Sequence, residues 1–412
     1  MMKFDKFELD NGLKIIVHND DSTPIVAMNI IYNVGARDES VRRTGFAHLF
    51  EHLMFSGSVN IPKYDAPLET AGGENNAFTN SDYTNYYLTI PKNNLETAFW
   101  LESDRMLNLA FSQKSLDVQK QVVIEEFKQN YLNQPFGDVY LLLKPLAFKK
   151  HPYRWNTIGK NIKHIESATL QYVRQFYRKY YNPNNAILTI AGDVDTDSVK
   201  KLAEKWFGPI PRGKDIVRHY PKEPLQLSPR KKSVKRDVPQ NALYMAWHMP
   251  NRTDIKFYHC DLISDILSNG NSSRLFRKLV KDKGVFSDIN AYVSGDIDDG
   301  LFIVSGKLLN ETKMKDAMAS VKNELDTISK VLVDESDFEK IKNKIEANMV
   351  FSKASVLTKA MNLGYYELLG DAGLWDSELE IYRSITREDL RKTASEIFTN
   401  NNQNTLIYNK LN

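Results

Sequence analysis

Apolar positions along the chain follow two periods, one typical of strands and one typical of helices. Two short apolar runs around residues 7–9 and 13–17 flank an Asn-Gly pair, the strongest local signal for a β-hairpin. Residues 25–34 are typical of a buried strand. Residues 44–55 form a longer apolar stretch between a possible N-cap threonine and a glycine, which predicts a buried helix.

The same kinds of segment continue through the first half of the chain. Residues 83–90 predict another strand, and residues 186–193 predict a strand followed by a helix near 196–206. Two longer helices are expected near residues 92–109 and 115–133, where apolar residues recur at three- and four-residue spacing among charged ones.

The composition changes between residues 209 and 236, which are rich in Pro, Lys and Arg and have little apolar periodicity. Such a segment is typical of an exposed linker. We therefore predict an α+β protein with two similar αβ halves, residues 1–210 and 237–412, joined by a linker at residues 211–236. The order of elements repeats loosely after the linker, with a strand at 242–248, helices at 257–267 and 273–281, strands within 289–307, long helices, and a last strand at 405–408.

Composition and charge exclude several classes of protein. The 412 residues are 42% hydrophobic, enough to bury substantial cores, and 55 basic against 52 acidic residues leave a formal charge of +3. Both signs are interspersed along the chain, so nothing indicates a nucleic-acid partner. The single cysteine, Cys260, excludes an internal disulfide framework and a thiolate zinc site. Any metal must therefore be held by histidine and carboxylate.

The chain shows no targeting or membrane segment. Residues 1–8 are charged from the start and lack the apolar core of a secretory signal, and no window approaches 18 consecutive apolar residues. We therefore predict no membrane span and a cytoplasmic location, or a periplasmic one if a leader has been removed.

The predicted helix at residues 44–55 carries a pattern that is typical of a metal site. Each helical residue advances by about 100°, so His48 and His52 lie one turn apart on one face with Glu51 beside them. Imidazoles suit Zn²⁺, and a hydrolytic site needs three protein ligands and a water. Glu51 is too close along the helix to be a comfortable third ligand but can take a proton from zinc-bound water. This inverted order is a zincin signature.

A hydrogen-bonded core cluster without metal is the alternative interpretation. The residues around the motif make the helix apolar on nearly all sides, so it should be buried. Burying two imidazoles and a carboxylate without partners is unfavourable by several kcal/mol, and a metal removes that cost. The context therefore favours the metal.

A third ligand must come from another segment, and residues 119–127 offer Glu125 and Glu126 within an apolar helix. Glu126 shares a face with Val122 and Val123, and Glu125 points about 100° away. Periodicity does not choose between them, and either one could be a solvated carboxylate.

The two motifs together resemble a known family. His-Leu-Phe-Glu-His at 48–52, followed by Val-Ile-Glu-Glu at 123–126, is similar to the pitrilysin/insulysin family of inverted-zinc metallopeptidases, which includes the mitochondrial processing peptidase. The likeness covers nearly the whole chain and implies two halves, each a mostly antiparallel sheet packed with helices, in a short branch that forms dimers around a cavity. Further similar segments lie at 35–39, 76–79, 82–87 and 270–276.

The resemblance implies a role for each residue of the metal site. It makes His48, His52 and Glu126 the ligands of one Zn²⁺ and Glu51 the general base, which chooses Glu126 over Glu125. The family commonly has a glutamate seven residues before the third ligand, where this chain has glutamine. We expect this change to tune the site without abolishing it.

The resemblance also implies a peptide-binding edge strand. Asn76, Ala77, Phe78 and Thr79 match the family strand to which an unfolded peptide adds as a further strand. The alternative interpretation of Asn75 and Asn76 is a polar turn.

A second departure concerns an arginine and a tyrosine that polarise the substrate carbonyl in family members that act alone. Alignment of residues 279–287 places Val280 and Ser287 at those positions, and neither can donate as required. A shifted alignment would instead place one of three other donors there: Arg274, Arg277 or Tyr292.

Missing donors would cost the reaction a few kcal/mol of oxyanion stabilisation. We therefore expect a non-identical partner subunit that lacks zinc and supplies the Arg/Tyr pair, with a homodimer as the alternative. The leading interpretation is a zinc endopeptidase that hydrolyses short or unstructured peptides in a dimeric chamber. The alternatives are a non-catalytic scaffold subunit and a peptide-binding clamp of the same fold, and the sequence does not predict the substrate.

Overall fold

The first of two sheets has six strands and places the predicted hairpin at its edge. The computed structural model describes residues 2–295 and 297–411. β2 runs parallel to β6, and all other neighbours in this sheet are antiparallel. The spatial order is β1 (Asp5–Glu8), β2 (Lys14–Asn19), β6 (Ala186–Gly192), β3 (Ile25–Tyr32), β5 (Thr84–Pro91) and β4 (Glu74–Thr79).

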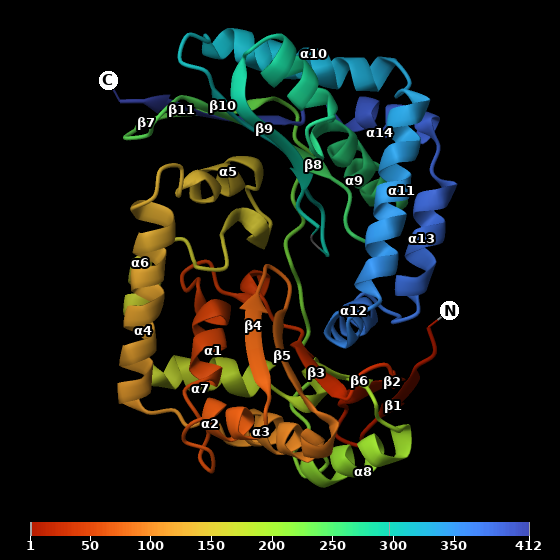
Figure 1. Cartoon of the computed structure of the whole chain (residues 1–412). Coiled ribbons are helices and arrows are strands. Elements are labelled where there is room, and N and C mark those ends of the chain that lie inside the picture. Colours follow the sequence, from red (N-terminus) through yellow and green to blue (C-terminus); the bar gives the residue numbers. More distant parts are fainter. Residues whose placement is uncertain (1, 296, 412) are drawn as a thin grey trace. The chain divides into compact units, whose positions relative to one another are not determined.

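Helices cover both faces of this sheet (Figure 1). On one face α12 (Val356–Leu368) lies against β3 and β6, where its Ala360 packs on Ala27 and Ala191. Other helices of the same unit contact the strands β2, β4 and β5 or pack on each other. These are α1 (Phe46–Met54), α2 (Asp65–Thr70), α3 (Leu95–Asn108), α4 (Gln113–Phe127), α6 (Ile162–Glu166), α7 (Leu170–Tyr180) and α8 (Thr196–Trp206).

The second sheet has five strands and repeats the topology of five strands of the first. β7 runs parallel to β11 and the remaining pairs are antiparallel, as in the series β2-β6-β3-β5-β4. Two mostly antiparallel sheets packed with helices confirm the predicted α+β class. The spatial order is β7 (Arg230–Arg236), β11 (Gln403–Lys410), β8 (Ala242–Met249), β10 (Gly300–Leu308) and β9 (Phe286–Val293).

The helices of the second sheet also lie on two faces. α5 (Val139–Ala147) places Val139 and Leu143 against Ala246 and Leu406. The opposite side holds the larger core of this unit. Its helices are α9 (Ile255–Ser268), α10 (Met314–Lys330), α11 (Glu335–Ser352), α13 (Leu374–Ser384) and α14 (Arg387–Ile397), of which α11 and α13 each cross a unit boundary. No helix among the described residues is long and apolar enough to cross a membrane.

Each compact unit contains a segment from the other half of the sequence. The first unit consists of residues 1–128, 155–220 and 350–377, and the second of residues 129–154, 221–349 and 378–412. Thus α5 belongs to the second unit, and α12 belongs to the first. The division into residues 1–210, 211–236 and 237–412 follows chain order and stays a prediction about domains.

Several local features differ from the sequence expectation. Residues 230–236, which we expected in an exposed linker, form β7, because the backbone pairs with β11 while most of the basic side chains stay exposed. The helix expected at 273–281 is a π-helix over Phe276–Asp282. Helix α4 starts at Gln113, capped by Ser112, and changes to a π-helix over Lys128–Leu132.

Candidate metal centre

Helix α1 has one polar face because the rest of its surface packs into an aromatic core. Phe50 stacks on Phe176 and Tyr181 with ring centroids 5.0 and 5.1 Å apart, and Phe46 meets Tyr172 edge-on. Phe46 and Phe50 are fully buried. This packing fixes the rotation of the helix and leaves the face of the two histidines directed away from the core.

The first turn of α1 is held by a buried carboxylate. Glu39 accepts hydrogen bonds from the backbone N–H groups of Gly45 at 2.9 Å and Ala47 at 2.8 Å, directly before His48. Burial raises the pKa of Glu39 to about 8, although the helix N–H groups act in the opposite direction. Sequence analysis gave Glu39 no role, because a glutamate 9 residues before a histidine has no recognisable pattern.

The residues that lead into α1 are also tightly packed. Gly45 adopts φ = 89°, and an added Cβ would lie 2.7 Å from Ile165 Cδ1 and 2.8 Å from the Ile158 carbonyl oxygen. Thr44, the N-cap expected from sequence, is not the cap: its Oγ1 lies 2.8 Å from His164 Nδ1 and accepts from the Lys160 N–H. Gly45 is the residue that permits this turn.

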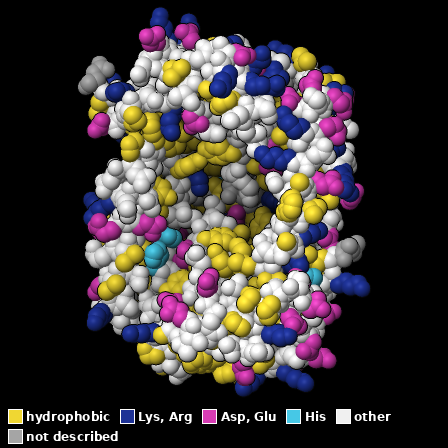
Figure 2. All heavy atoms as spheres, viewed as in Figure 1, with side chains coloured by type: hydrophobic (Ala, Val, Ile, Leu, Met, Phe, Trp, Pro, Cys, Tyr) yellow, Lys and Arg dark blue, Asp and Glu magenta, His cyan; other side chains and the backbone are white. Residues whose placement is uncertain are grey.

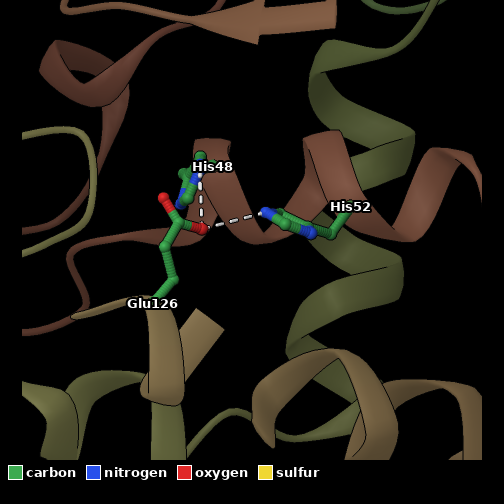
Figure 3. A group of neighbouring side chains, drawn as sticks. All are labelled: His48, His52 and Glu126. Atoms are coloured by element: carbon green, nitrogen blue, oxygen red, sulfur yellow. Dashed lines mark ion pairs between the residues drawn. The ribbon is translucent and has the colours of Figure 1, made fainter. Parts of the chain in front are cut away.

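The predicted motif meets one of the two adjacent glutamates. His48 and His52 project from α1, and Glu126 reaches them from α4 (Figure 3). Glu126 is half-buried, with 34% of its side chain exposed, whereas Glu125 is 65% exposed and pairs with Lys128 Nζ at 2.7 Å. The structure thus places Glu126 in the group and Glu125 in solvent.

The distances from the Glu126 carboxylate to the two imidazoles fit a tetrahedral ion, and the three donor atoms lie within 4.8 Å of one another. Glu126 Oε2 lies 3.6 Å from His48 Nε2 and 3.4 Å from His52 Nε2. Ligands about 2.0–2.1 Å from a tetrahedral zinc ion are about 3.3–3.4 Å apart, whereas a direct charge-assisted hydrogen bond would be near 2.8 Å. Two imidazole nitrogens and one carboxylate oxygen also form a donor set that zinc accepts, so the residues fit the metal.

Electrostatics favour the protonation states that a metal requires. Burial lowers the pKa of His48, although the carboxylates of Glu126 and Glu51 oppose this effect. Donation from the neighbouring His52 imidazole lowers the pKa of Glu126, partial burial opposes it, and His48 adds to the lowering. A metal binds neutral imidazole and ionised carboxylate, so these shifts leave the ligands ready for it.

Glu51 lies on the same helix as the histidines and is only partly buried. Its side chain forms no hydrogen bond or ion pair with the described residues. Burial raises the pKa of Tyr86 and of Tyr181, and the charge of Glu51 acts on both in the same direction. A carboxylate without a fixed partner can accept a proton, as a general base must.

The glutamine that replaces a family glutamate has a definite contact. Gln119 Nε2 donates to Ser56 Oγ at 3.3 Å and so connects α4 to the residues directly after α1. This is a structural link between the two helices that carry the metal-binding side chains.

The proposed substrate strand β4 lies at the edge of its sheet and pairs only with β5. The Ala77 N–H points away from β5 and donates to Asn76 Oδ1 at 2.8 Å. In an antiparallel pair, groups on alternate residues point the same way, so 75, 77 and 79 direct backbone groups to the open edge. The polar-turn interpretation of Asn75 and Asn76 is wrong, since both are in the strand.

The candidate carbonyl-binding residues of the second unit are engaged within that unit. Arg274 donates to Glu324 at 2.9 Å and Arg277 to Asp337 at 2.8 Å. The hydroxyls of Tyr292 and Tyr140 are 2.5 Å apart. Val280 contributes to the core, and exposed Ser287 accepts from Gln240.

Figure 2 shows histidine side chains beside acidic ones at the molecular surface, over the region where Figure 1 draws α1. Basic and acidic side chains are interspersed over the rest of this face, as the sequence predicts. The side chains of His48, His52 and Glu126 are 13%, 25% and 34% exposed, so the metal-binding group is accessible to solvent.

Comparison with known proteins gives consistent matches over the whole chain. Residues 14–153 match the family model described as Insulinase (Peptidase family M16), and residues 167–345 match the model described as Peptidase M16 inactive domain. A zinc protease of Helicobacter pylori, PqqE, is 27% identical over 98% of this chain and 92% of the relative.

Solved structures agree with the observed fold. The crystal structure of a protease from Helicobacter pylori has a TM-score of 0.95 at 26% identity and covers 99% of this chain and 100% of that one. The periplasmic protease PqqL from Escherichia coli shares the fold, with a TM-score of 0.80 at 18% identity. This chain covers 47% of that protein, and 99% of this chain is matched.

Proposed function

Because the chain belongs to the pitrilysin-like peptidase family M16, we propose that it is a zinc-dependent endopeptidase. The single observation that supports this most strongly is the spacing of His48, His52 and Glu126, which fits three ligands of a tetrahedral ion. Relatives that match nearly the whole chain carry the name zinc protease.

Within this proposal each residue has a defined part. Bound zinc would polarise a water molecule and the carbonyl of the scissile peptide bond. The Glu51 carboxylate accepts a proton as that water attacks the carbonyl carbon. It then passes the proton to the amine that leaves when the C–N bond breaks. Glu39 and Gly45 keep the first turn of α1 in place, and so act as positioning residues.

We place the substrate on β4 as an added strand. The edge offers backbone groups at 75, 77 and 79, and β-augmentation binds an extended peptide mainly through its main chain. Helix α1 contacts β4 directly, so a peptide on this edge lies close to the helix that carries His48. Unfolded segments and short peptides fit this mode because they have free backbone groups.

A second copy of the fold is expected to complete the site. Arg274, Arg277 and Tyr292 already have partners within their own unit. Val280 has no side-chain donor, and the Ser287 hydroxyl already donates to the Lys307 carbonyl. This chain also covers less than half of PqqL, so a dimer of such chains would equal one molecule of that size. We propose a homologous, non-identical subunit that supplies the Arg/Tyr pair around a shared chamber.

The metal site is tested by comparing two adjacent glutamates. Glu126→Gln removes one ligand, so the variant should lose bound zinc on dialysis and lose zinc-dependent hydrolysis of an unstructured peptide. Glu125→Gln makes the same chemical change at an exposed residue, so this variant should keep both its zinc and its hydrolytic activity. Zinc content is measured by atomic emission with circular dichroism as the folding control. Equal zinc retention by Glu126→Gln and the wild type would sink the proposed ligand set.

A further inference from the structure

A hollow lies in the second unit, on the face of the sheet that also carries α10. Its volume is about 670 Å³, within the range of about 300–1,000 Å³ that is typical of small-molecule sites. Strands β7 and β11 form one wall, and the first three turns of α10 form another. All the lining residues belong to this one unit.

The two units differ in helix packing at this position. In the first unit, α8 follows β6 and packs on β2 and α3. By topology β7, β11 and α10 correspond to β2, β6 and α3. In the second unit α14 packs on α10 and β8, and residues of β7 and β11 beside α10 line the hollow.

The floor of the hollow is apolar and adaptable. Met245 and Ile407 are buried at its base, and Met314 and Met318 are half-buried on the α10 side. Unbranched thioether side chains can adjust to apolar groups of different shapes. The floor therefore suits a flexible aliphatic or aromatic group.

The rim has a single sign of charge. Lys231 on β7 and Lys315 and Lys322 on α10 line the hollow, and no acidic residue does. None of the three lysine side chains forms an ion pair or hydrogen bond within the described part of the chain. Arg274 and Arg277 of the same unit lie opposite carboxylates, whereas these three lysines face one hollow that has no acidic lining residue.

The position of Lys315 adds to the positive charge around the hollow. It lies in the first turn of α10, whose N-cap Lys313 supplies no side-chain acceptor. Positive charge near a helix N-terminus is unfavourable, because that end of the helix already carries partial positive charge. Asp316 of the same turn offsets part of this charge but does not line the hollow, where an anion would pair with the lysines.

We propose that this hollow binds a small amphipathic anion, with an oxyanion head group at the three lysines and an apolar chain over the methionine floor. The site is separate from the metal centre in sequence and in unit. It does not depend on the proposed peptidase activity.

Titration calorimetry of the full chain with four probes tests this proposal. Decanoate and decyl phosphate each have an aliphatic tail and differ in their oxyanion head group. The third probe, 1-decanol, has an aliphatic tail without charge, and inorganic phosphate is an oxyanion without a tail. We expect one saturable site for at least one of the two amphipathic anions, and at least about tenfold weaker binding of decanol and of phosphate.

Matched variants locate the site. The triple change of Lys231, Lys315 and Lys322 to Gln should weaken the anion about tenfold or more, while the same change at exposed Lys114, Lys200 and Lys214 should not. Ala319→Trp, which fills the hollow without changing charge, should also prevent binding.

Three results would overturn the proposal: no saturable site for either amphipathic anion, binding of decanol as tight as that of the anions, or unchanged binding by both the lysine and Ala319 variants. Unfolding temperatures of all variants show whether a loss of binding comes from misfolding.

Discussion

Single residues at the start of α1 determine whether the two histidines can face the same ion. Glu39 satisfies the N–H groups of Gly45 and Ala47, and Gly45 adopts a left-handed conformation against Ile158 and Ile165. These residues do not touch the predicted zinc ligands. They fix the path of the chain two residues before His48, and a ligand displaced by even 1 Å binds a metal poorly.

Gly45→Ala is expected to destabilise the protein and to weaken zinc binding. The new Cβ adds the left-handed penalty of about 1 kcal/mol and a backbone clash with Ile158, so the loss should be at least about 2 kcal/mol. Denaturant unfolding and zinc titration measure both effects.

Gly270→Ala is the matched control for this change. Gly270 has nearly the same φ, 91°, but nothing lies within 4 Å of its added Cβ. Gly270→Ala should lower the free energy of unfolding by only about 1 kcal/mol and leave zinc affinity unchanged. Equal losses in the two variants would show that contact with Ile158 and Ile165 does not matter.

Residue roles were only partly predictable from sequence. Helical geometry and the spacing of His48, Glu51 and His52 are enough to predict that the three side chains share one face of a helix. The choice of Glu126 over Glu125 does not, because periodicity left both possible. The phase of α4 depends on the burial of Val123 and Phe127, and only tertiary packing reveals it.

Among the elements, β4 combines an open sheet edge with direct contact to α1. The Ala77 N–H lies on the open side, so it can be removed without breaking the ladder to β5. Proline at an edge position of this kind is tolerated in sheets. The edge therefore permits a test that separates peptide binding from folding.

Ala77→Pro is expected to raise KM for an unstructured peptide about tenfold, because it removes a main-chain donor from the proposed binding edge. Stability should change little, since the pairing with β5 does not use this N–H. Steady-state kinetics and thermal unfolding provide the two measurements. Ala77→Val keeps the donor and should keep KM, and an unaltered KM in the proline variant would refute strand addition at β4.

Strand β7 shows where element prediction fails. Five of its seven residues are Lys or Arg, a composition that predicts an exposed linker. Its backbone nevertheless pairs with β11 over the whole strand, and basic side chains are typical of a protected sheet edge. Local composition cannot reveal this pairing, because the partner strand lies about 170 residues away.

At the scale of the whole molecule, the sequence predicts two αβ halves but not the exchange of helices between units. A local sequence pattern does not show which sheet a helix covers. In the structure α5 packs in the second unit and α12 in the first. Each unit is therefore built from segments of both halves of the sequence.

The need for a partner is tested by comparing the isolated chain with a reconstituted pair. We expect the isolated zinc-loaded chain to hydrolyse peptide slowly, and a homologous subunit carrying the Arg/Tyr pair without the metal motif to raise kcat about 10²–10³-fold. Addition of more of the same chain is the control. Full turnover by the isolated chain would contradict the requirement for a different partner while leaving the zinc site intact.

The most direct test of the central claim is the turnover of Glu51→Gln in the assembly that hydrolyses peptide. Glutamine preserves the size of the side chain but cannot accept the proton, so kcat should fall by about 10²–10⁴-fold. Zinc content should equal that of the wild type, since the predicted ligands are His48, His52 and Glu126. Wild-type turnover by the zinc-loaded Glu51→Gln protein would contradict Glu51 as the base and the mechanism proposed for this site.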